Sequence, residues 1–201
     1  MIEIYTDGSS TKKRSGWGFV ALVDGAKVYE KAGTEHQGDT NQKMEIIAVI
    51  EACDWAINSE YIKNHNVIVY SDSAYVINCF KDKWFVNWEQ NGWKNSKKEP
   101  VANSLEWKFL IKFFKMSNFT FEKVKGHAGH IHNERADDLA QGKTTPDKDS
   151  YFNNNKEQDS LYIEVSNIFL NYAMKRISIK EAVMNVVNLV NKERIGNNNN
   201  E

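Results

Sequence analysis

The sequence has little cysteine, no long apolar run and no excess of charge of either sign. Its 201 residues include only two cysteines, Cys53 and Cys79. Two isolated thiols in a chain of this size are better interpreted as small buried side chains than as a disulfide. No apolar run approaches the ~18 residues that span a bilayer, and the first residues, Met-Ile-Glu-Ile-Tyr-Thr-Asp, lack the pattern of a secretory signal. We therefore expect no membrane association and a cytoplasmic location.

The near balance of charges removes one common indication of nucleic-acid binding. The net charge is −1 at pH 7, whereas proteins that bind phosphates usually carry an excess of Lys and Arg. Any argument for a nucleic-acid partner must therefore rest on the local distribution of charge. Apolar residues make up 41% of the chain and charged residues 26%, which are globular proportions and exclude disorder throughout.

The first 145 residues have the pattern of an α/β domain. Short apolar segments predict five strands, at residues 1–9, 17–23, 27–35, 67–71 and 119–124. Apolar residues at helical spacing, together with end signals, predict helices at residues 44–58, 73–80, 101–116 and 133–141. The first three strands form an antiparallel meander, with Asp24-Gly25 as the tight turn between the second and third. The fold class is therefore α/β, a mixed five-stranded sheet with helices against its faces.

The composition changes after Pro146, and residues 146–201 contain twelve asparagines. We interpret residues 146–160 as a polar linker, 161–194 as a small helical hairpin and 195–201 as a disordered end. The sequence Ser178-Ile-Lys-Glu181 predicts a capping box at the start of the second helix. The apolar faces of these helices are expected to pack against each other, against the first domain or against a partner protein.

Four acids have settings that suit a metal site. Asp7 ends the first strand and Asp72 follows the strand at 67–71, so both carboxylates would emerge at one edge of the sheet if those strands are parallel neighbours. Glu45 and Asp137 lie on helices from which they could join. Four carboxylates suit Mg²⁺ or Mn²⁺, and two such ions could assist phosphodiester cleavage. Each acid could equally be a solvated surface residue, and spacing alone does not decide.

Five ordered motifs resemble those of the type 1 ribonucleases H: residues 6–9 (TDGS), 40–45 (TNQKME), 72–76 (DSAYV), 125–130 (KGHAGH) and 133–140 (NERADDLA). The resemblance covers about residues 1–142. It implies a ribonuclease H-like fold carrying a C-terminal extension. It also implies endonucleolytic hydrolysis of the RNA strand of RNA:DNA hybrids by two metal ions, leaving 5′-phosphate and 3′-hydroxyl ends.

The same resemblance implies roles for individual residues. Asp7 would bridge two Mg²⁺ ions, with Mn²⁺ as a substitute. Asp137 would lie near the water-activating ion, and Glu45 and Asp72 near the leaving-group ion. His127, in a glycine-flanked loop, could move protons or help the product leave. A zinc site shared by His127, His130 and His132 is a weaker alternative, because no fourth ligand lies nearby in the sequence.

Residues 81–98 interleave five lysines with three tryptophans and two acids. This segment resembles the basic protrusion with which the family holds the DNA strand, and we expect hybrid contacts from Trp84, Trp88, Lys94, Lys97 and Lys98. The alternative is that the tryptophans fill a core, which we favour for Trp107. The resemblance also nominates positions near the scissile RNA and one DNA-strand phosphate, namely Gly8, Ser9, Asn41 and Gln42 for the first and Thr40 for the second. The cluster Lys12-Lys13-Arg14 either meets phosphates or forms a solvated turn.

The chain departs from the family pattern at several positions. Ala74 stands where an amide side chain is common, the loop after Ser9 lacks an Asn, and Glu89 and Gln90 replace a more basic pair. These changes could weaken binding or shift the cleavage preference. Two other readings are an integrase-like or resolvase-like nuclease on the same fold, and a nucleic-acid-binding protein that has lost catalysis.

Overall fold

The computed structural model describes residues 1–116, 118–126, 128–147, 178, 181 and 183–188. The chain divides into two compact units, residues 1–154 and 155–201. Within the described residues, no helix is both long enough and apolar enough to cross a membrane.

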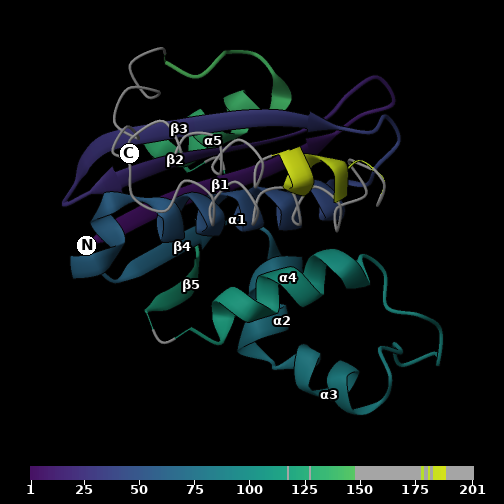
Figure 1. Ribbon diagram of the computed structural model, residues 1–201. Helices are drawn as coiled ribbons and strands as arrows, with labels where there is room; N and C mark the ends of the chain where they lie inside the picture. The colour runs from purple at the N-terminus through teal and green to yellow at the C-terminus, as the bar shows by residue number, and fades with distance from the viewer. Residues whose placement is uncertain (117, 127, 148–177, 179–180, 182, 189–201) are drawn as a thin grey trace, which may run out of the picture. The chain divides into compact units, whose positions relative to one another are not determined.

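The first unit is built on a five-stranded mixed sheet with the order β3-β2-β1-β4-β5 (Figure 1). The strands are β1 (Ile2–Ser10), β2 (Ser15–Val23), β3 (Ala26–Glu35), β4 (Val67–Ser71) and β5 (Phe119–Lys123). β1, β2 and β3 pair antiparallel, whereas β4 is parallel to both β1 and β5. This topology confirms the predicted meander and the predicted mixed sheet.

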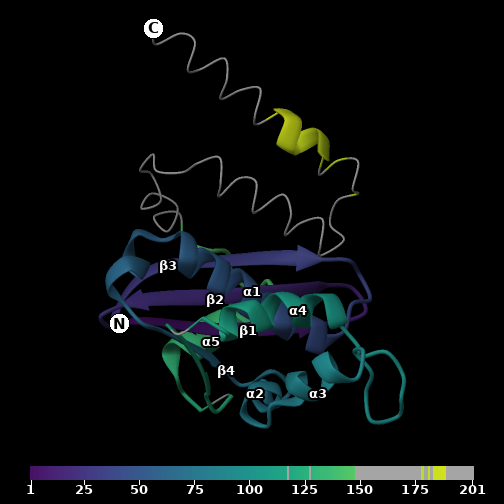
Figure 2. The same cartoon turned by 60° about the horizontal axis from the view of Figure 1, so that its bottom comes forward.

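Helices cover both faces of the sheet (Figure 1). They are α1 (Asn41–Asn58), α2 (Ala74–Lys81), α3 (Trp84–Gln90), α4 (Ser104–Phe114) and α5 (Ile131–Gln141), with the short 3-10 helix η1 (Glu60–Asn64) after α1. α4 lies beside α1 (Figure 2). On the other face, α5 packs against β1 and β2 through a buried cluster of Tyr5, Val20, Leu22, Ala136 and Leu139. This packing sets α5, which carries Asp137, directly against the strand that carries Asp7.

Three expectations about the core are confirmed. Cys53 and Cys79 are both buried free thiols. Trp107 in α4 is fully buried, and its indole N–H donates to the Tyr75 hydroxyl at 3.1 Å.

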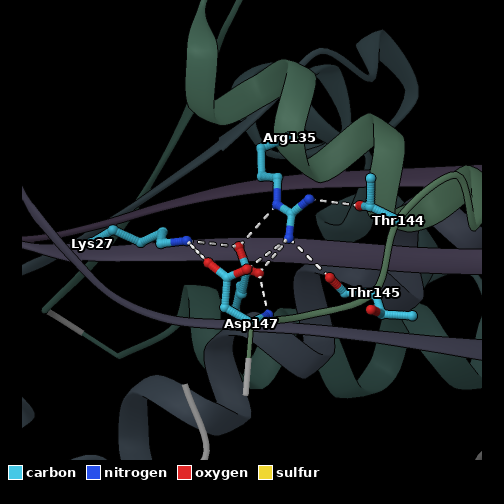
Figure 3. Close-up of polar contacts among 6 residues, drawn as sticks. Lys27, Arg135, Thr144, Thr145 and Asp147 are labelled. Atoms are coloured by element: carbon cyan, nitrogen blue, oxygen red, sulfur yellow. Dashed lines mark hydrogen bonds and ion pairs between the residues drawn. The ribbon is translucent and has the colours of Figure 1, made fainter. Parts of the chain in front are cut away.

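Residues 144–147, which follow α5, are held by contacts with the buried carboxylate of Glu30 and with Arg135 (Figure 3). Glu30 in β3 has no exposed surface and accepts from Arg135 at 2.6 and 3.1 Å and from Lys27 at 3.3 Å. The Asp147 backbone N–H also donates to Glu30, at 2.6 Å. Arg135 in turn donates to the Thr144 hydroxyl at 2.7 Å and the Thr145 carbonyl at 2.9 Å. The contacts of β3 and α5 therefore extend to Asp147, the last described residue of this unit.

In the second unit the structure describes residues 178, 181 and 183–188, and residues 181 and 183–188 are helical. The predicted capping box is confirmed. The Ser178 backbone N–H donates to the Glu181 carboxylate at 2.7 Å, and the Glu181 backbone N–H donates to the Ser178 hydroxyl at 3.2 Å. The predicted helix at 161–175, the polar segment at 148–160 and the end at 195–201 lie outside the described residues.

Candidate active site

Asp7 and Asp72 lie at the same edge of the sheet. β1 and β4 are parallel, and Thr6 pairs with Ser71 in their register. Asp7 and Asp72 each follow those partners by one residue, so their side chains leave neighbouring strands at the carboxyl edge. The two strands are therefore parallel neighbours, as expected. Asp7 does not end β1, however, because this strand continues to Ser10 through its pairing with β2. The charge of Asp72 acts on Asp7 strongly enough to raise the pKa of Asp7.

Glu45 reaches this edge because α1 begins against β1 at Gly8. A Cβ atom at Gly8 would lie 2.2 Å from the Glu45 backbone nitrogen, a separation that side chains do not tolerate. The Glu45 carboxylate accepts hydrogen bonds from the Ser73 hydroxyl and from the Asn41 amide, the latter at 3.1 Å. Burial, together with the charge of Asp72, raises the pKa of Glu45. Glu45 and Asp72 therefore belong to one electrostatic site.

Asp137 completes the group from the other face of the sheet. α5 approaches closely at Gly18, which pairs with Asp7 in the β1–β2 register, and a Cβ atom there would lie 2.6 Å from Cβ of Leu139. Asp137 lies close enough to Asp7 to raise the pKa of Asp7. Four carboxylates from four different parts of the chain thus converge at one edge of the sheet.

The environment of Asp7 is unfavourable for a negative charge. Burial is the largest cause, followed by the charge of Asp72 and then by the hydrogen bond and charge of Asp137, and together they raise the pKa of Asp7 to about 8. The N–H of Gly8 donates to Asp7 at 2.8 Å and opposes the rise only in part. Asp7 therefore holds a proton at neutral pH unless a cation offsets its neighbours.

The donor set fits hard divalent cations, because all four side chains offer carboxylate oxygens and neither cysteine contributes. In this structure three of the acids accept hydrogen bonds from the protein. Asp7 accepts from the Gly8 N–H, Glu45 accepts from Ser73 and Asn41, and Asp137 accepts from the Gln141 amide. Within the described residues, no three His, Cys, Asp or Glu side chains are grouped tightly enough to share one ion. A carboxylate oxygen that accepts one hydrogen bond keeps a second lone pair, so these donors can stay in place while the carboxylates bind an ion.

The glycine-flanked loop lies against the third acid. A Cβ atom at Gly126 would lie 2.3 Å from the Asp72 carboxylate oxygen. His127 itself lies outside the described residues, so its proposed role stays a prediction. The rings of His130 and His132 lie 4.5 and 5.6 Å from that of Tyr5, and burial lowers the pKa of His132.

The residues nominated for substrate contacts lie in β1, at the cap of α1 and in the first turn of α1. Asn41 accepts from the Ser10 N–H at 3.0 Å and donates to Glu45, so it joins the end of β1 to the start of α1. The Thr40 hydroxyl accepts from the Lys43 N–H at 3.2 Å as the cap of α1. Thr40, Asn41 and Gln42 are exposed, Gly8 is buried and Ser9 is half-buried.

The predicted protrusion comprises α3 and the loop that follows it (Figure 1). Trp84 and Trp88 are half-buried, and Trp88 packs 5.6 Å from Trp107 and 6.1 Å from Trp93. Both tryptophans therefore contribute to an aromatic core while keeping an exposed part. The three nominated lysines are exposed, at Lys94, Lys97 and Lys98. Glu89, which stands where the family commonly has a more basic residue, pairs with Lys115 at 2.7 Å. This ion pair offsets the charge of Glu89.

Several residues that shape the site are not marked as site residues by the sequence. Ser73 supports Glu45, and its sequence signal is its place in the motif at residues 72–76. Arg14 had been expected at phosphates or in a solvated turn, but it donates to the Ala140 carbonyl at the end of α5. Lys12 and Lys13 remain exposed. Gln141 and Lys143 contact Asp137, and no sequence pattern marked them.

Comparison with known proteins places this geometry in a family. The RNase H family model matches residues 1–145. A Ribonuclease H of Syntrophomonas wolfei is 49% identical over 142 residues, which cover 70% of this chain and 93% of the relative.

Two solved structures resemble the fold. LC9-RNase H1, described as a type 1 RNase H with the type 2 active-site motif, is 26% identical over 72% of this chain and 74% of its own, with a TM-score of 0.57. The foamy viral protease-reverse transcriptase in complex with RNA/DNA hybrid is 25% identical over 75% of this chain and 20% of its own, with a TM-score of 0.61. With four acids at the sheet edge and a family match over most of its length, the chain belongs to the ribonuclease H family and is an endoribonuclease.

Proposed function

We propose that the protein hydrolyses the RNA strand of RNA:DNA hybrids with two divalent cations, leaving 5′-phosphate and 3′-hydroxyl ends. The convergence of Asp7, Glu45, Asp72 and Asp137 at one edge of the sheet carries this proposal. The raised pKa of Asp7 supports it, because such crowding is costly without a cation. The hybrid is proposed because the relatives are ribonucleases H and one similar structure holds an RNA/DNA hybrid.

Mg²⁺ is the proposed physiological ion, and Mn²⁺ the substitute. When bound, the ions would neutralise the carboxylates, activate the attacking water and stabilise the leaving oxygen. Asp7, Glu45, Asp72 and Asp137 would hold them. Asp7 must release its proton before it can serve as a ligand.

Other residues would orient the substrate and move protons. Ser73 and Asn41 hold the Glu45 carboxylate from two sides, which fixes its direction before substrate arrives. The scissile RNA would be contacted by Asn41, Gln42 and the Gly8-Ser9 backbone. Its 2′-hydroxyl would distinguish RNA from DNA. His127 would exchange protons with the reacting groups or assist product release.

The protrusion would hold the DNA strand. Lys94, Lys97 and Lys98 would neutralise its phosphates, while the exposed parts of Trp84 and Trp88 would pack against its sugars. The Glu89–Lys115 pair offsets the negative charge of Glu89 beside this loop. Thr40 would contact one further DNA phosphate.

The proposal is tested by incubating the purified protein with RNA:DNA, RNA:RNA and DNA:DNA duplexes, each strand labelled separately, with and without Mg²⁺. We expect Mg²⁺-dependent cleavage of the RNA strand of the hybrid alone. Cleavage of a DNA strand would favour an integrase-like or resolvase-like nuclease. Hybrid binding without cleavage in Mg²⁺ or Mn²⁺ would identify a protein that has lost catalysis.

A further inference from the structure

A lysine outside the recognised motifs lies beside the fourth acid. α5 ends at Gly142, whose backbone is left-handed (φ 71°). The Gly142 N–H donates to the Leu139 carbonyl at 3.0 Å, and the Lys143 N–H donates to the Asp138 carbonyl at 2.9 Å. This turn folds the chain back, so the Lys143 side chain runs along the last turn of α5.

The turn is also held in place by Arg14. Its guanidinium donates to the Ala140 carbonyl, and a Cβ atom at Gly142 would lie 2.7 Å from the guanidinium carbon. A side chain at Gly142 would therefore meet Arg14 as well as backbone strain. Because the turn has little freedom, Lys143 leaves α5 in a fixed direction.

The Lys143 ammonium has two carboxylates within reach. It lies 3.9 Å from Asp137 and 3.1 Å from Asp138. Among the ion pairs of the described residues, Lys143 supplies the one that includes any of Asp7, Glu45, Asp72 and Asp137. The other oxygen of Asp137 accepts from Gln141. In this arrangement both oxygens of Asp137 therefore face donors from its own helix end.

We propose that Lys143 is a displaceable counter-cation for Asp137 that weakens divalent-ion binding at the active site. The proposal rests on the metal-dependent function above. When an ion engages Asp137, Asp138 retains the ammonium, since Asp138 is already the nearer partner and stands outside the four-acid group. Lys143 is thus a positioning residue: it acts on the metal site through Asp137 and touches no reacting atom.

The size of the effect follows from exposure. The Lys143 side chain is 55% exposed and that of Asp137 is 14% exposed, so water and salt screen their attraction. We expect removal of the charge to tighten Mn²⁺ binding about two- to fivefold, a range typical of partly exposed ion pairs. The difference in Mn²⁺ affinity between the variant and the wild type should shrink as KCl is raised, because salt screens the attraction between Lys143 and Asp137 in the wild type.

The test measures Mn²⁺ binding to the full-length protein by titration calorimetry, without substrate. Lys143→Met and Lys143→Gln should both bind Mn²⁺ more tightly than the wild type, and Lys143→Arg should restore wild-type affinity. Lys63→Met is the matched control, because Lys63 is an exposed lysine of η1 that precedes the amino end of β4, whereas the acids lie at its carboxyl end. A purely structural role for Lys143 would change the melting temperature without changing metal affinity in this direction.

The outcomes separate the two proposals. If the wild type binds Mn²⁺ and Asp137→Asn weakens binding, while both neutral variants bind like the wild type or more weakly, the role of Lys143 is wrong and the metal site stands. If the wild type binds no Mn²⁺, or Asp137→Asn binds it equally well, the metal-dependent function fails and this inference fails with it.

Discussion

At the scale of single residues, the candidate site is a cluster of carboxylates whose proximity costs stability. Asp7 lies on a core strand between Asp72 and Asp137, where burial and repulsion both oppose ionisation. Catalytic positions commonly carry such shifts, whereas a carboxylate retained only for stability would be paired with a cation. The conflict between stability and function should therefore be measurable at Asp7.

Asp7→Asn should abolish hydrolysis and stabilise the metal-free protein. The pKa of Asp7 is about 8 in the folded protein and ~3.9 in an unfolded chain, so the folded state binds this proton more tightly. The resulting stability is fully present below about pH 4 and is lost as the pH rises toward 8. Urea unfolding in EDTA should show the wild type weakening between pH 5 and 8.5, by on the order of 1 kcal/mol per unit of pKa shift.

The Asp7→Asn variant should show a flatter pH profile and greater stability than the wild type at pH 8. A variant that loses stability in parallel with the wild type, or that still turns over hybrid near the normal rate, would contradict the assignment of Asp7.

Ser73→Ala should reduce activity while preserving the fold. Ser73 donates to Glu45 and also caps α2 by accepting from the Val76 N–H at 3.3 Å. Loss of the cap should cost ~1 kcal/mol of unfolding free energy. Loss of the donor should slow cleavage about tenfold, a value on the order of one hydrogen bond to a charged group. Ser73→Thr keeps the hydroxyl and should recover most of the stability and most of the activity. Equal activity in the wild type, Ser73→Ala and Ser73→Thr would show that Glu45 does not need the Ser73 hydrogen bond.

His127→Ala should slow cleavage by a smaller factor than loss of an acid, because a general acid or base typically contributes ~10² to 10⁴-fold. His132→Ala is the control, since His132 packs beside Tyr5 rather than in the loop against Asp72. Single-turnover rates on one hybrid would compare the two. Greater damage from the His132 change would make the loop assignment wrong.

At the scale of elements, local signals predicted some boundaries and tertiary contacts set others. The strand at 67–71 was predicted to the residue, because a short apolar run between polar segments leaves no choice. The helix predicted at 101–116 is in fact α4, Ser104–Phe114. Its start is delayed because the Val101 N–H donates to the Trp93 carbonyl at 2.9 Å and Asn103 is left-handed. Neither contact is visible in helical periodicity.

The C-terminal boundary of the catalytic unit gives a prediction at this scale. A chain ending at Thr145 should fold and cut hybrid, since it keeps all four acids and the protrusion. It should also be less stable, by ~1 kcal/mol, than a chain ending at Asp149, because buried Glu30 loses the Asp147 N–H. The melting temperatures and specific activities of both truncations and the full chain provide the measurement.

Full-length Asp147→Ala separates backbone from side chain in this comparison. It keeps the N–H and loses two ion pairs, with Lys27 and with Arg135, in which the Asp147 side chain is 57% exposed, so it should melt close to the wild type. Equal stability of the two truncations would show that the contact to Glu30 contributes nothing, and a folded truncation unable to cleave would overturn the division between catalytic unit and extension.

At the scale of the whole molecule, the four acids could be nominated from the sequence because each lies within a motif. The packing that brings them together could not be predicted. Gly18 allows α5 to approach the sheet, and Arg14 and Lys143 fix the end of that helix. Gly18 and Arg14 are far from Asp137 along the chain, and Lys143 lies outside the five motifs. Their roles depend on contacts between elements that only the folded chain brings together.

The central claim is that the carboxylates around Asp7 form a divalent-metal site, and proton release on metal binding tests it most directly. Titration calorimetry of Mn²⁺ at pH 7, repeated in buffers of different ionisation enthalpy, counts the protons displaced per ion. With a pKa of about 8 for Asp7, the wild type should release about one proton at pH 7 and far less at pH 9, and Asp7→Asn should bind weakly without that release. Tight binding with no proton released at pH 7, or equal affinity in Asp7→Asn, would contradict the account.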